Sequence, residues 1–332
     1  MAQEQLRIIT NMTFWQSALW REQTDSIRSP NQRYRESTFG TALSDAWRLY
    51  LRRRAYDVVL TMGMRESMCY GLLCLLTGVR SKQIMTEVFI DHAQPERWMW
   101  RIKTALYAHI ARRAIGIITN SSAEIASTAH RFNLPENRLR FVPLNATIPP
   151  EEAQEAAPPY ILSAGRTLRD YDTLLQAAPE LQVPVVIVCG KQDMSGARIP
   201  DNVKVLRELD RSQYLDRLRE CAVVALPLQP TERSTGQVVL LEAMAMGKPV
   251  ITTRAPGTMD YIHDGEDGLL VEHANPRALA QRCKELMASP EERRRIGSTA
   301  RERVRQRHGN DAHARAKLEA IRALHGAHNT PA

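Results

Sequence analysis

"STGQVVLLEAMAMGKPVI", residues 234–251, is almost wholly apolar, yet it carries one carboxylate, Glu242, near its centre. Gly236 suits a loop that leads into a helix, and the residues between it and Gly247 are good helix formers. Apolar side chains nearly complete the circle of this helix, which predicts that it is buried. An ionised carboxylate there costs several kcal/mol unless it is paired or hydrogen-bonded. Glu242 therefore either caps a backbone group at the rim of the core or binds the hydroxyl groups of a ligand.

The quoted stretch is part of an alternation of apolar strands and helices in the second half of the chain. Strands are expected at 160–165, 183–190, 202–209, 222–228 and 249–255, and helices at 171–181, 212–221, 237–246, 276–307 and 311–325, with a short helix near 257–262 and a turn-rich stretch at 263–272. The first half repeats the pattern more faintly, with strands at 6–12, 56–63, 82–89, 114–121 and 139–145 and helices at 40–54, 65–77, 96–112 and 121–132. Apolar strands that alternate with helices form parallel sheets covered on both faces. The predicted class is α/β, with two doubly wound parallel-sheet domains.

Composition and motifs exclude several classes of protein. The five cysteines lie mostly in apolar runs without metal-ligand spacing, which is typical of reduced core residues in a cytoplasmic protein. The N-terminus has no secretory pattern, and no apolar run is long enough to span a bilayer. Neither GxGxxG after a first strand nor GxxxxGK[ST] occurs, so the sequence lacks the motifs that are typical of dinucleotide-binding and P-loop sites. No metal is expected.

The positive charge is unevenly distributed along the chain. The net charge is +8, and residues 1–150 hold 20 Lys and Arg against 12 Asp and Glu, whereas the remainder is balanced at 25 of each. The whole surplus therefore lies in the first half, which indicates that this half meets something anionic. No groove-reading or base-stacking module accompanies the charge, so a nucleic-acid partner is not expected.

Two segments of the first half combine basic residues with Trp and Leu. They are "AWRLYLRRR" (46–54) and "ERWMWRIKTALYAHIARR" (96–113), and their candidate surface residues are Arg52, Arg53, Arg97, Trp98 and Arg101. Such segments are typical of helices that lie on anionic lipid. The alternative is a core-facing apolar stripe with a solvated basic rim. The expected localisation is cytoplasmic, with peripheral association at the inner face of the membrane.

Several motifs resemble the C-terminal domain of retaining glycosyltransferases of the family 4 type. They are "ILSAGRTLRDYDTLLQAA", the stretch quoted first, "APGTMDYIHDGEDGLLVEHANPRALAQ" and "SPEERRRIGSTARERV", while "AIGIITNSSAEIASTAHRFNLPENRLRFVPLN" resembles the end of that family's N-terminal domain. The likeness covers about residues 57–62 and 114–310. It implies the GT-B architecture, in which two Rossmann-like domains face each other across a cleft and the substrate is a nucleotide sugar, with no cofactor.

The resemblance and the linker-like composition of "PPEEAQEAAPPY" together predict the domain organisation. An N-terminal acceptor-side domain spans 1–148, a linker 149–159, and a nucleotide-sugar-binding domain 160–308. Residues 309–332 form a C-terminal helix that is expected to pack back on the N-terminal domain.

A donor site is expected at the end of the strand 160–165 and at the start of the quoted helix. Arg166 follows that strand, at the edge where open α/β sheets bind ligands, and it either contacts the donor or forms a surface salt bridge. Residues Ser234, Thr235, Gly236 and Gln237 surround a helix N-terminus, which suits a pyrophosphate. The resemblance implies that Glu242 accepts hydrogen bonds from the ribose hydroxyls.

The sequence departs from the family pattern at the sugar end of this site. The family usually has a glutamate eight positions before Glu242, where this chain has Ser234, and the nearest carboxylate is Glu232. The usual lysine after the arginine is also missing. Arg169 either replaces it or pairs with a neighbouring aspartate, Asp170 or Asp172.

The resemblance implies retaining transfer of a sugar to a lipid-linked or glycan acceptor. A front-face path is expected for it, because no pair of carboxylates is evidently placed for double displacement. The catalytic candidates are His92, Arg166 and Glu232, and the alternative for His92 is a structural role in its loop. Two other functions remain open: a nucleotide-sugar 2-epimerase of the same fold, and a nucleotide-sugar-binding protein without activity.

Overall fold

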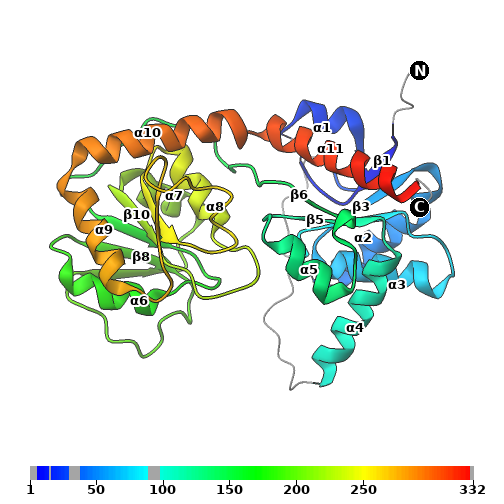
Figure 1. Cartoon of the computed structure of the whole chain (residues 1–332), viewed down its shortest axis with the longest axis horizontal. Coiled ribbons are helices and arrows are strands. Elements are labelled where there is room, and N and C mark those ends of the chain that lie inside the picture. The colour runs from blue at the N-terminus through cyan, green and yellow to red at the C-terminus, as the bar shows by residue number, and fades with distance from the viewer. Residues whose placement is uncertain (1–5, 15, 30–37, 89–97, 330–332) are drawn as a thin grey trace. The chain divides into compact units, whose positions relative to one another are not determined.

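The computed structural model describes residues 6–14, 16–29, 38–88 and 98–329, and the chain divides into two compact units (Figure 1). Unit 1 comprises Met1–Pro143 together with Asn310–Ala332, and unit 2 comprises Leu144–Gly309. Each unit contains a six-stranded sheet in which all strands are parallel and helices flank the sheet. The predicted α/β class with two Rossmann-like units is confirmed.

The sheet of unit 2 has the strand order of a Rossmann fold. Its strands are β7 (Ile161–Ala164), β8 (Val185–Cys189), β9 (Val203–Arg207), β10 (Val223–Leu226), β11 (Val250–Thr253) and β12 (Leu269–Val271), and their spatial order is β12-β11-β10-β7-β8-β9. The chain starts in the middle at β7, builds outward to β9, and then returns to β10 on the other side of β7. Open sheets of this kind bind ligands where the order reverses, which here is at the carboxyl ends of β7 and β10.

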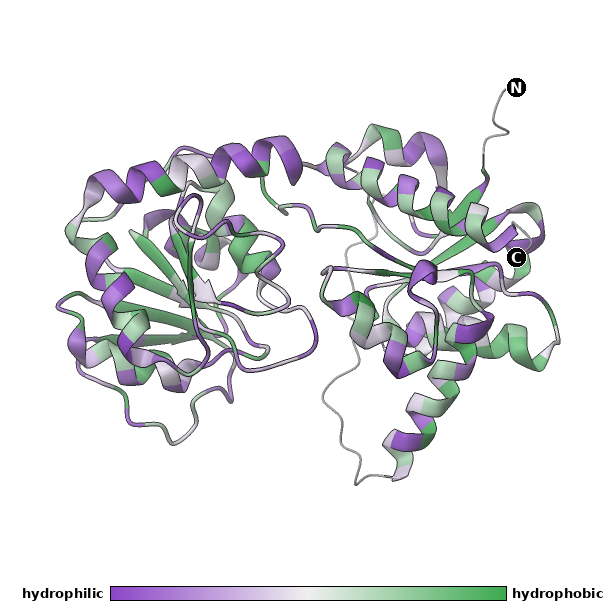
Figure 2. Cartoon of the chain, viewed as in Figure 1, coloured by the Kyte–Doolittle hydropathy of each residue, from purple (hydrophilic) through white to green (hydrophobic). Residues whose placement is uncertain are grey.

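Helices cover this sheet, and all of them except α8 (Gln237–Ala245) begin at a residue whose side chain accepts a hydrogen bond from the first turn. They are α6 (Tyr171–Ala177), α7 (Arg211–Glu220), α8, α9 (Pro276–Ala288) and α10 (Pro290–Arg307). The side chains of Asp170, Asp210, Asn275 and Ser289 accept hydrogen bonds from the first turns of α6, α7, α9 and α10. Figure 2 shows that the strands of this sheet are mostly hydrophobic, whereas helices such as α10 contain many hydrophilic residues.

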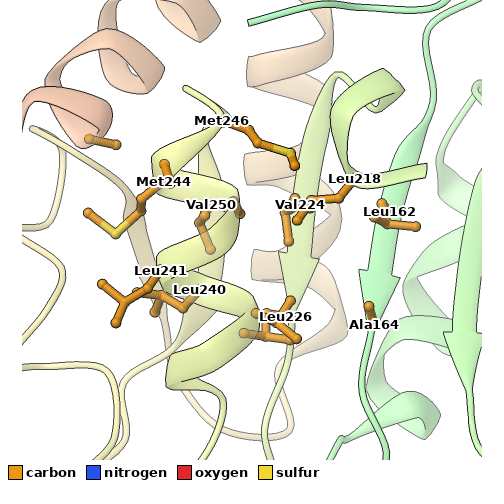
Figure 3. Packing of buried hydrophobic residues seen from close by; sticks show 14 of the residues in the cluster. Leu162, Ala164, Leu218, Val224, Leu226, Leu240, Leu241, Met244, Met246 and Val250 are labelled. Atoms are coloured by element: carbon orange, nitrogen blue, oxygen red, sulfur yellow. The ribbon is translucent and has the colours of Figure 1, made fainter. Parts of the chain in front are cut away.

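Helix α8 is buried, as its apolar sequence predicts. Leu240 and Leu241 lie in one hydrophobic cluster with Leu226 of β10 and Leu162 of β7 (Figure 3). Apart from Val238, which is exposed, every residue of α8 is buried. Glycines in the left-handed region flank the helix, with φ of 88° at Gly236 and 63° at Gly247.

The sheet of unit 1 has a different strand order. Its strands are β1 (Ile8–Thr10), β2 (Thr24–Ser26), β3 (Val58–Met62), β4 (Gln83–Thr86), β5 (Gly116–Thr119) and β6 (Leu139–Phe141), in the spatial order β2-β1-β3-β4-β5-β6. Its helices are α1 (Ala18–Gln23), α2 (Phe39–Arg52), α3 (Met64–Leu76), α4 (Trp98–Arg113), α5 (Glu124–Phe132) and α11 (Asn310–Asn329). Helix α11 lies beside α1, and Ser17 donates a hydrogen bond to Asp311 at 2.6 Å (Figure 1).

Several expectations about local structure were wrong. The segment 149–159 is not a free linker, because Glu151 pairs with Arg219 of α7 at 3.0 Å and Glu155 pairs with Arg293 of α10 at 2.8 Å. Its glutamates therefore bind it to unit 2. Helix α1 and strand β2 were not predicted, residues 257–262 form turns instead of a helix, and the turn-rich stretch 263–272 contains β12.

The structure also bears on the cysteines and on membrane spans. All five cysteines are buried and none is in a disulfide. Among the helices of the described residues, none has the length and apolarity that crossing a bilayer requires.

Candidate functional site

The loops that follow β7 and β10 are tied together at the reversal point of the unit 2 sheet. The backbone N–H of Asp170 donates to the carbonyl of Pro227 at 3.0 Å, and that of Gln229 donates to Leu168 at 3.0 Å. The hydroxyl of Thr235 donates to the carbonyl of Thr167 at 3.3 Å. The edge of the sheet at which a ligand is expected is thus formed by two mutually bonded loops.

Arg169 lies in the middle of this loop pair. Its Nε donates to the carbonyl of Ala164 at 2.9 Å, and its Nη1 donates to the carbonyl of Thr167 at 2.8 Å and to the hydroxyl of Thr235 at 3.5 Å. Burial lowers the pKa of Arg169 from its usual value. In the part of the chain that the structure describes, no carboxylate forms an ion pair with it. Arg169 is therefore a half-buried cation held by neutral acceptors, next to the N-terminus of α8, and the alternative of a surface pair with a neighbouring aspartate is wrong.

Two glycines make this arrangement sterically possible. Gly165 has φ of 132°, and a Cβ there would lie 2.4 Å from the guanidinium of Arg169. A Cβ on Gly257 would lie 2.4 Å from the backbone nitrogen of Thr235. Glycine at both positions lets the chain pack closely against the two loops.

The N-terminus of α8 completes this edge. Ser234, Thr235 and Gln237 are buried around Gly236, and the glycine supplies no side-chain cap to the first turn of the helix. The first turn contains no acidic residue either. A helix N-terminus of this kind favours an anion.

A cavity of about 290 Å3 lies beside this edge within unit 2. It is lined by Ala164, Gly165, Arg166, Val188, Cys189, Leu209, Asp210, Arg211, Tyr214 and Val239. Arg166 is exposed and lies 3.6 Å from Glu208, so the weak surface ion pair considered from the sequence is present. Arg166 is nevertheless a cation on the cavity wall.

Glu242 binds protein groups in this structure. Arg211 Nη2 donates to its Oε1 at 2.6 Å, Tyr214 Oη donates to Oε2 at 2.8 Å, and the hydroxyl of Thr147 donates to Oε1. The Glu242 side chain is 0% exposed, so these contacts answer how its charge is tolerated in an apolar helix. No local sequence signal identifies these partners, because they lie 31, 28 and 95 residues away.

The other predicted residues are distributed over both units. Glu232 is exposed in the loop before α8. Arg53 was wrongly expected on the surface: it is buried, and its guanidinium lies 3.7 Å from the centre of the Tyr50 ring. His92 and Arg97 lie outside the described residues.

The surface of unit 1 carries apolar groups beside basic ones. Among the described residues, most exposed large hydrophobic side chains lie on α2, α3 and α4: Phe39, Leu43, Trp47, Leu51, Leu76, Trp98, Met99 and Ile102. On α2 they are four residues apart and so form one face, next to the exposed Arg48 and Arg52. On α4, Trp98 is 69% exposed, and Arg101 and Lys103 are exposed near it.

No metal site is formed by the described residues. They contain no cluster of three or more His, Cys, Asp or Glu side chains that could hold a metal ion.

Comparison with known families identifies unit 2. Residues 145–303 match the family model described as glycosyl transferases group 1, and this match covers nearly the whole of unit 2. The predicted resemblance to a glycosyltransferase C-terminal domain is confirmed for this part of the chain.

Curated relatives match shorter parts of the chain. The D-inositol 3-phosphate glycosyltransferase of Corynebacterium urealyticum is 28% identical over 238 residues, which cover 61% of this chain and 54% of that protein. An uncharacterized glycosyltransferase of Methanocaldococcus jannaschii is 37% identical over 102 residues, covering 30% of this chain and 28% of that protein. The chain thus spans about half the length, or less, of these relatives.

Solved structures share the fold of the whole chain. Sucrose-phosphate synthase from Thermosynechococcus elongatus has a TM-score of 0.68 at 19% identity, covering 92% of this chain and 84% of that one. Anabaena HepE in complex with UDP-glucose has a TM-score of 0.69 at 16% identity, covering 96% and 100%. These similarities confirm the GT-B architecture.

Proposed function

We propose that the protein is a retaining glycosyltransferase that moves a sugar from a nucleotide-sugar donor to a glycan or lipid-linked acceptor. One observation carries the proposal: in the region that matches the glycosyl transferases group 1 model, the half-buried cation Arg169 lies beside the N-terminus of α8, where the strand order reverses. A diphosphate is the part of a nucleotide sugar that needs a cation and free backbone N–H groups together.

Each part of the nucleotide-sugar donor is assigned to particular residues of unit 2. Arg169 and the N-terminal turn of α8, at Ser234, Gly236 and Gln237, bind the diphosphate. Arg166 contacts the donor from the cavity wall, and Glu242 binds the ribose once its present partners give way. The HepE structures with UDP and UDP-glucose, which share this fold, support a nucleotide sugar as the donor class.

The chemistry follows a front-face path without a protein nucleophile. The bond from the sugar's anomeric carbon to the diphosphate breaks, and the acceptor oxygen bonds to the same face of that carbon. The departing diphosphate takes the acceptor's proton. Arg169 and the helix N-terminus stabilise the charge that develops on the diphosphate. Glu232 replaces the glutamate usual at position 234 in holding the sugar, and His92 positions the sugar or the acceptor. Since the protein supplies these charges itself, the reaction needs no metal and no cofactor.

The acceptor reaches the protein at an anionic membrane surface. Exposed apolar side chains on α2 and α4, such as Trp47 and Trp98, insert among lipid headgroups, and Arg52 and Arg101 pair with their charges. A protein that docks in this way is peripheral, and its acceptor is carried on a lipid.

Nucleotide binding and transfer together test the proposal. Thermal shift with UDP, GDP and ADP should show stabilisation by at least one of them, because a ligand that binds only the folded state raises its stability. Labelled nucleotide sugars are then incubated with and without membrane extract. Transfer of label to an acceptor supports the proposal, conversion to a 2-epimer supports the isomerase, and binding without turnover supports an inactive protein. No binding of any nucleotide would reject all three.

A further inference from the structure

Glu242 lies behind the wall of the unit 2 cavity, and its present partners separate it from the space where a donor is expected. Both carboxylate oxygens accept hydrogen bonds from protein groups, and the side chain has no exposed surface. A ligand hydroxyl can therefore reach Glu242 only if one of Arg211, Tyr214 and Thr147 moves away.

Arg211 is the partner best placed to move. It lines the cavity, and its side chain is 51% exposed although one of its nitrogens binds a fully buried carboxylate. Its backbone is held at the start of α7, because Asp210 and Gln213 cap that helix reciprocally. The guanidinium can thus rotate into the cavity while the helix stays in place. Tyr214 is one turn further along α7 and packs against the core, so its hydroxyl moves only with its ring.

We propose that Arg211 is the exchangeable counter-ion of the donor site, an inference that rests on the proposed function. The hydroxyls of the ribose replace its guanidinium on Glu242, and the guanidinium turns to the diphosphate. Glu242 keeps hydrogen-bond donors throughout, and Arg211 exchanges one anion for another, so neither charge is left without a partner. No covalent bond changes. Arg211 thereby sets how strongly the protein distinguishes a ribose from a sugar that lacks the two hydroxyls.

Calorimetry with matched ligands tests this exchange. The affinities of UDP, GDP and ADP and of their 2′,3′-dideoxy counterparts are measured for the wild type and for Arg211→Gln. The ribose form should bind more tightly than the dideoxy form, and this ratio should rise about tenfold in Arg211→Gln, because a neutral amide competes for Glu242 less strongly than a guanidinium. The affinity of the dideoxy form should change little, because a ligand without these hydroxyls leaves Arg211 on Glu242 in the wild type.

Two further variants serve as controls. Arg166→Gln removes a charge from the same cavity without touching Glu242, so it should weaken both ligands equally and leave the ratio unchanged. Glu242→Gln should bring the ratio close to unity. If Arg211→Gln does not fold, as judged by its thermal midpoint, Arg211→Lys replaces it, because lysine keeps the charge but lacks the planar guanidinium that reaches Glu242 and Thr147. It should also raise the ratio.

Each other outcome has a distinct meaning. A ratio that is unchanged in the Arg211 variant shows that Arg211 stays on Glu242, and the exchange is rejected. A ratio near unity in the wild type shows that Glu242 does not meet the ribose, which rejects the exchange while leaving nucleotide binding intact. If no nucleotide binds the wild type, the proposed function itself has failed.

Discussion

The two sheets reverse their strand order at comparable places, yet the side chains found there differ in kind. In unit 2, between β7 and β10, the loops bring Arg166 and Arg169 to the sheet edge beside a helix N-terminus. In unit 1, between β1 and β3, the amide of Asn11 donates to the carbonyl of Met62 at 3.0 Å and accepts from its backbone N–H at 2.8 Å. The unit 2 edge offers cations to a ligand, whereas at the unit 1 edge a side chain binds the neighbouring strand.

The surplus charge of unit 1 lies on its helices instead. Arg52 and Arg101 are exposed on α2 and α4 beside large apolar side chains. The same architecture thus carries cations at an internal sheet edge in unit 2 and on an external helix surface in unit 1. If this division is functional, changes in the two units should have separable effects on nucleotide and membrane binding.

The largest expected effect is at Arg169. Arg169→Ala removes the half-buried cation, and the affinity for a nucleoside diphosphate should fall about tenfold to a hundredfold, as for other hydrogen bonds to charged groups. Calorimetry measures the loss. Arg169→Lys keeps the charge and should recover part of the affinity. Unchanged affinity in Arg169→Ala, with the fold intact, would mean that Arg169 only joins the loops after β7 and β10.

The next largest effect is expected on the surface of unit 1. Arg52→Glu with Arg101→Glu should lower binding to phosphatidylglycerol vesicles about thirtyfold, because each basic contact contributes about 1 kcal/mol near an anionic surface. Added salt should have the same effect in the wild type. Cosedimentation measures binding, and nucleotide affinity should not change.

A matched control for this pair lies in unit 2. Arg217→Glu with Arg282→Glu reverses two arginines that pair with glutamates within their own helices, and vesicle binding should be retained. If vesicle binding falls equally in both double variants, the net charge of the protein explains the binding, and no docking surface exists on α2 and α4.

A smaller effect is expected at Glu232. If it holds the sugar, Glu232→Gln should lower kcat about fivefold, because a neutral amide replaces a charge-assisted acceptor. The affinity for free nucleoside diphosphate should stay the same, since that ligand carries no sugar. Steady-state kinetics with calorimetry separates the two quantities, and full turnover in the variant would leave Glu232 as a surface residue.

Arg166 should matter less than Arg169, although both follow β7. Its side chain is exposed and shares its charge with Glu208 at 3.6 Å, so solvent screens its contact with a ligand. Arg166→Ala should weaken nucleotide binding by no more than about fivefold, or about 1 kcal/mol. A loss equal to that of Arg169→Ala would reverse the assignment of the two cations.

Chelation is the change with the smallest expected effect. Transfer should be the same with and without EDTA, because Arg169 and the N-terminus of α8 provide the positive charge that a metal would otherwise supply. Activity lost on chelation and restored by a divalent cation would show that the donor binds as a metal complex.

Much of the fold could be predicted from local sequence. The strands of unit 2 are short apolar runs between helices with clear capping residues, and α8 was identified as buried from its composition alone. Helix α1 and strand β2 could not be identified, because α1 has only 6 residues and β2 only 3, which is too short for a periodic pattern. Residues 149–159 were misread because proline and glutamate resemble a linker until their arginine partners are known.

The candidate site could be located but not assembled from the sequence. By itself the sequence determined that a carboxylate sits in a buried helix, that an arginine pair follows β7, and that the surplus charge lies in the first half, since these depend on neighbouring residues and on counting. Only the tertiary structure decided that Glu242 pairs with Arg211, that Arg169 is the half-buried cation and Arg166 the exposed one, and that Arg53 faces inward. The physical reason is that desolvation and ion pairing depend on which distant segments the folded sheets bring together.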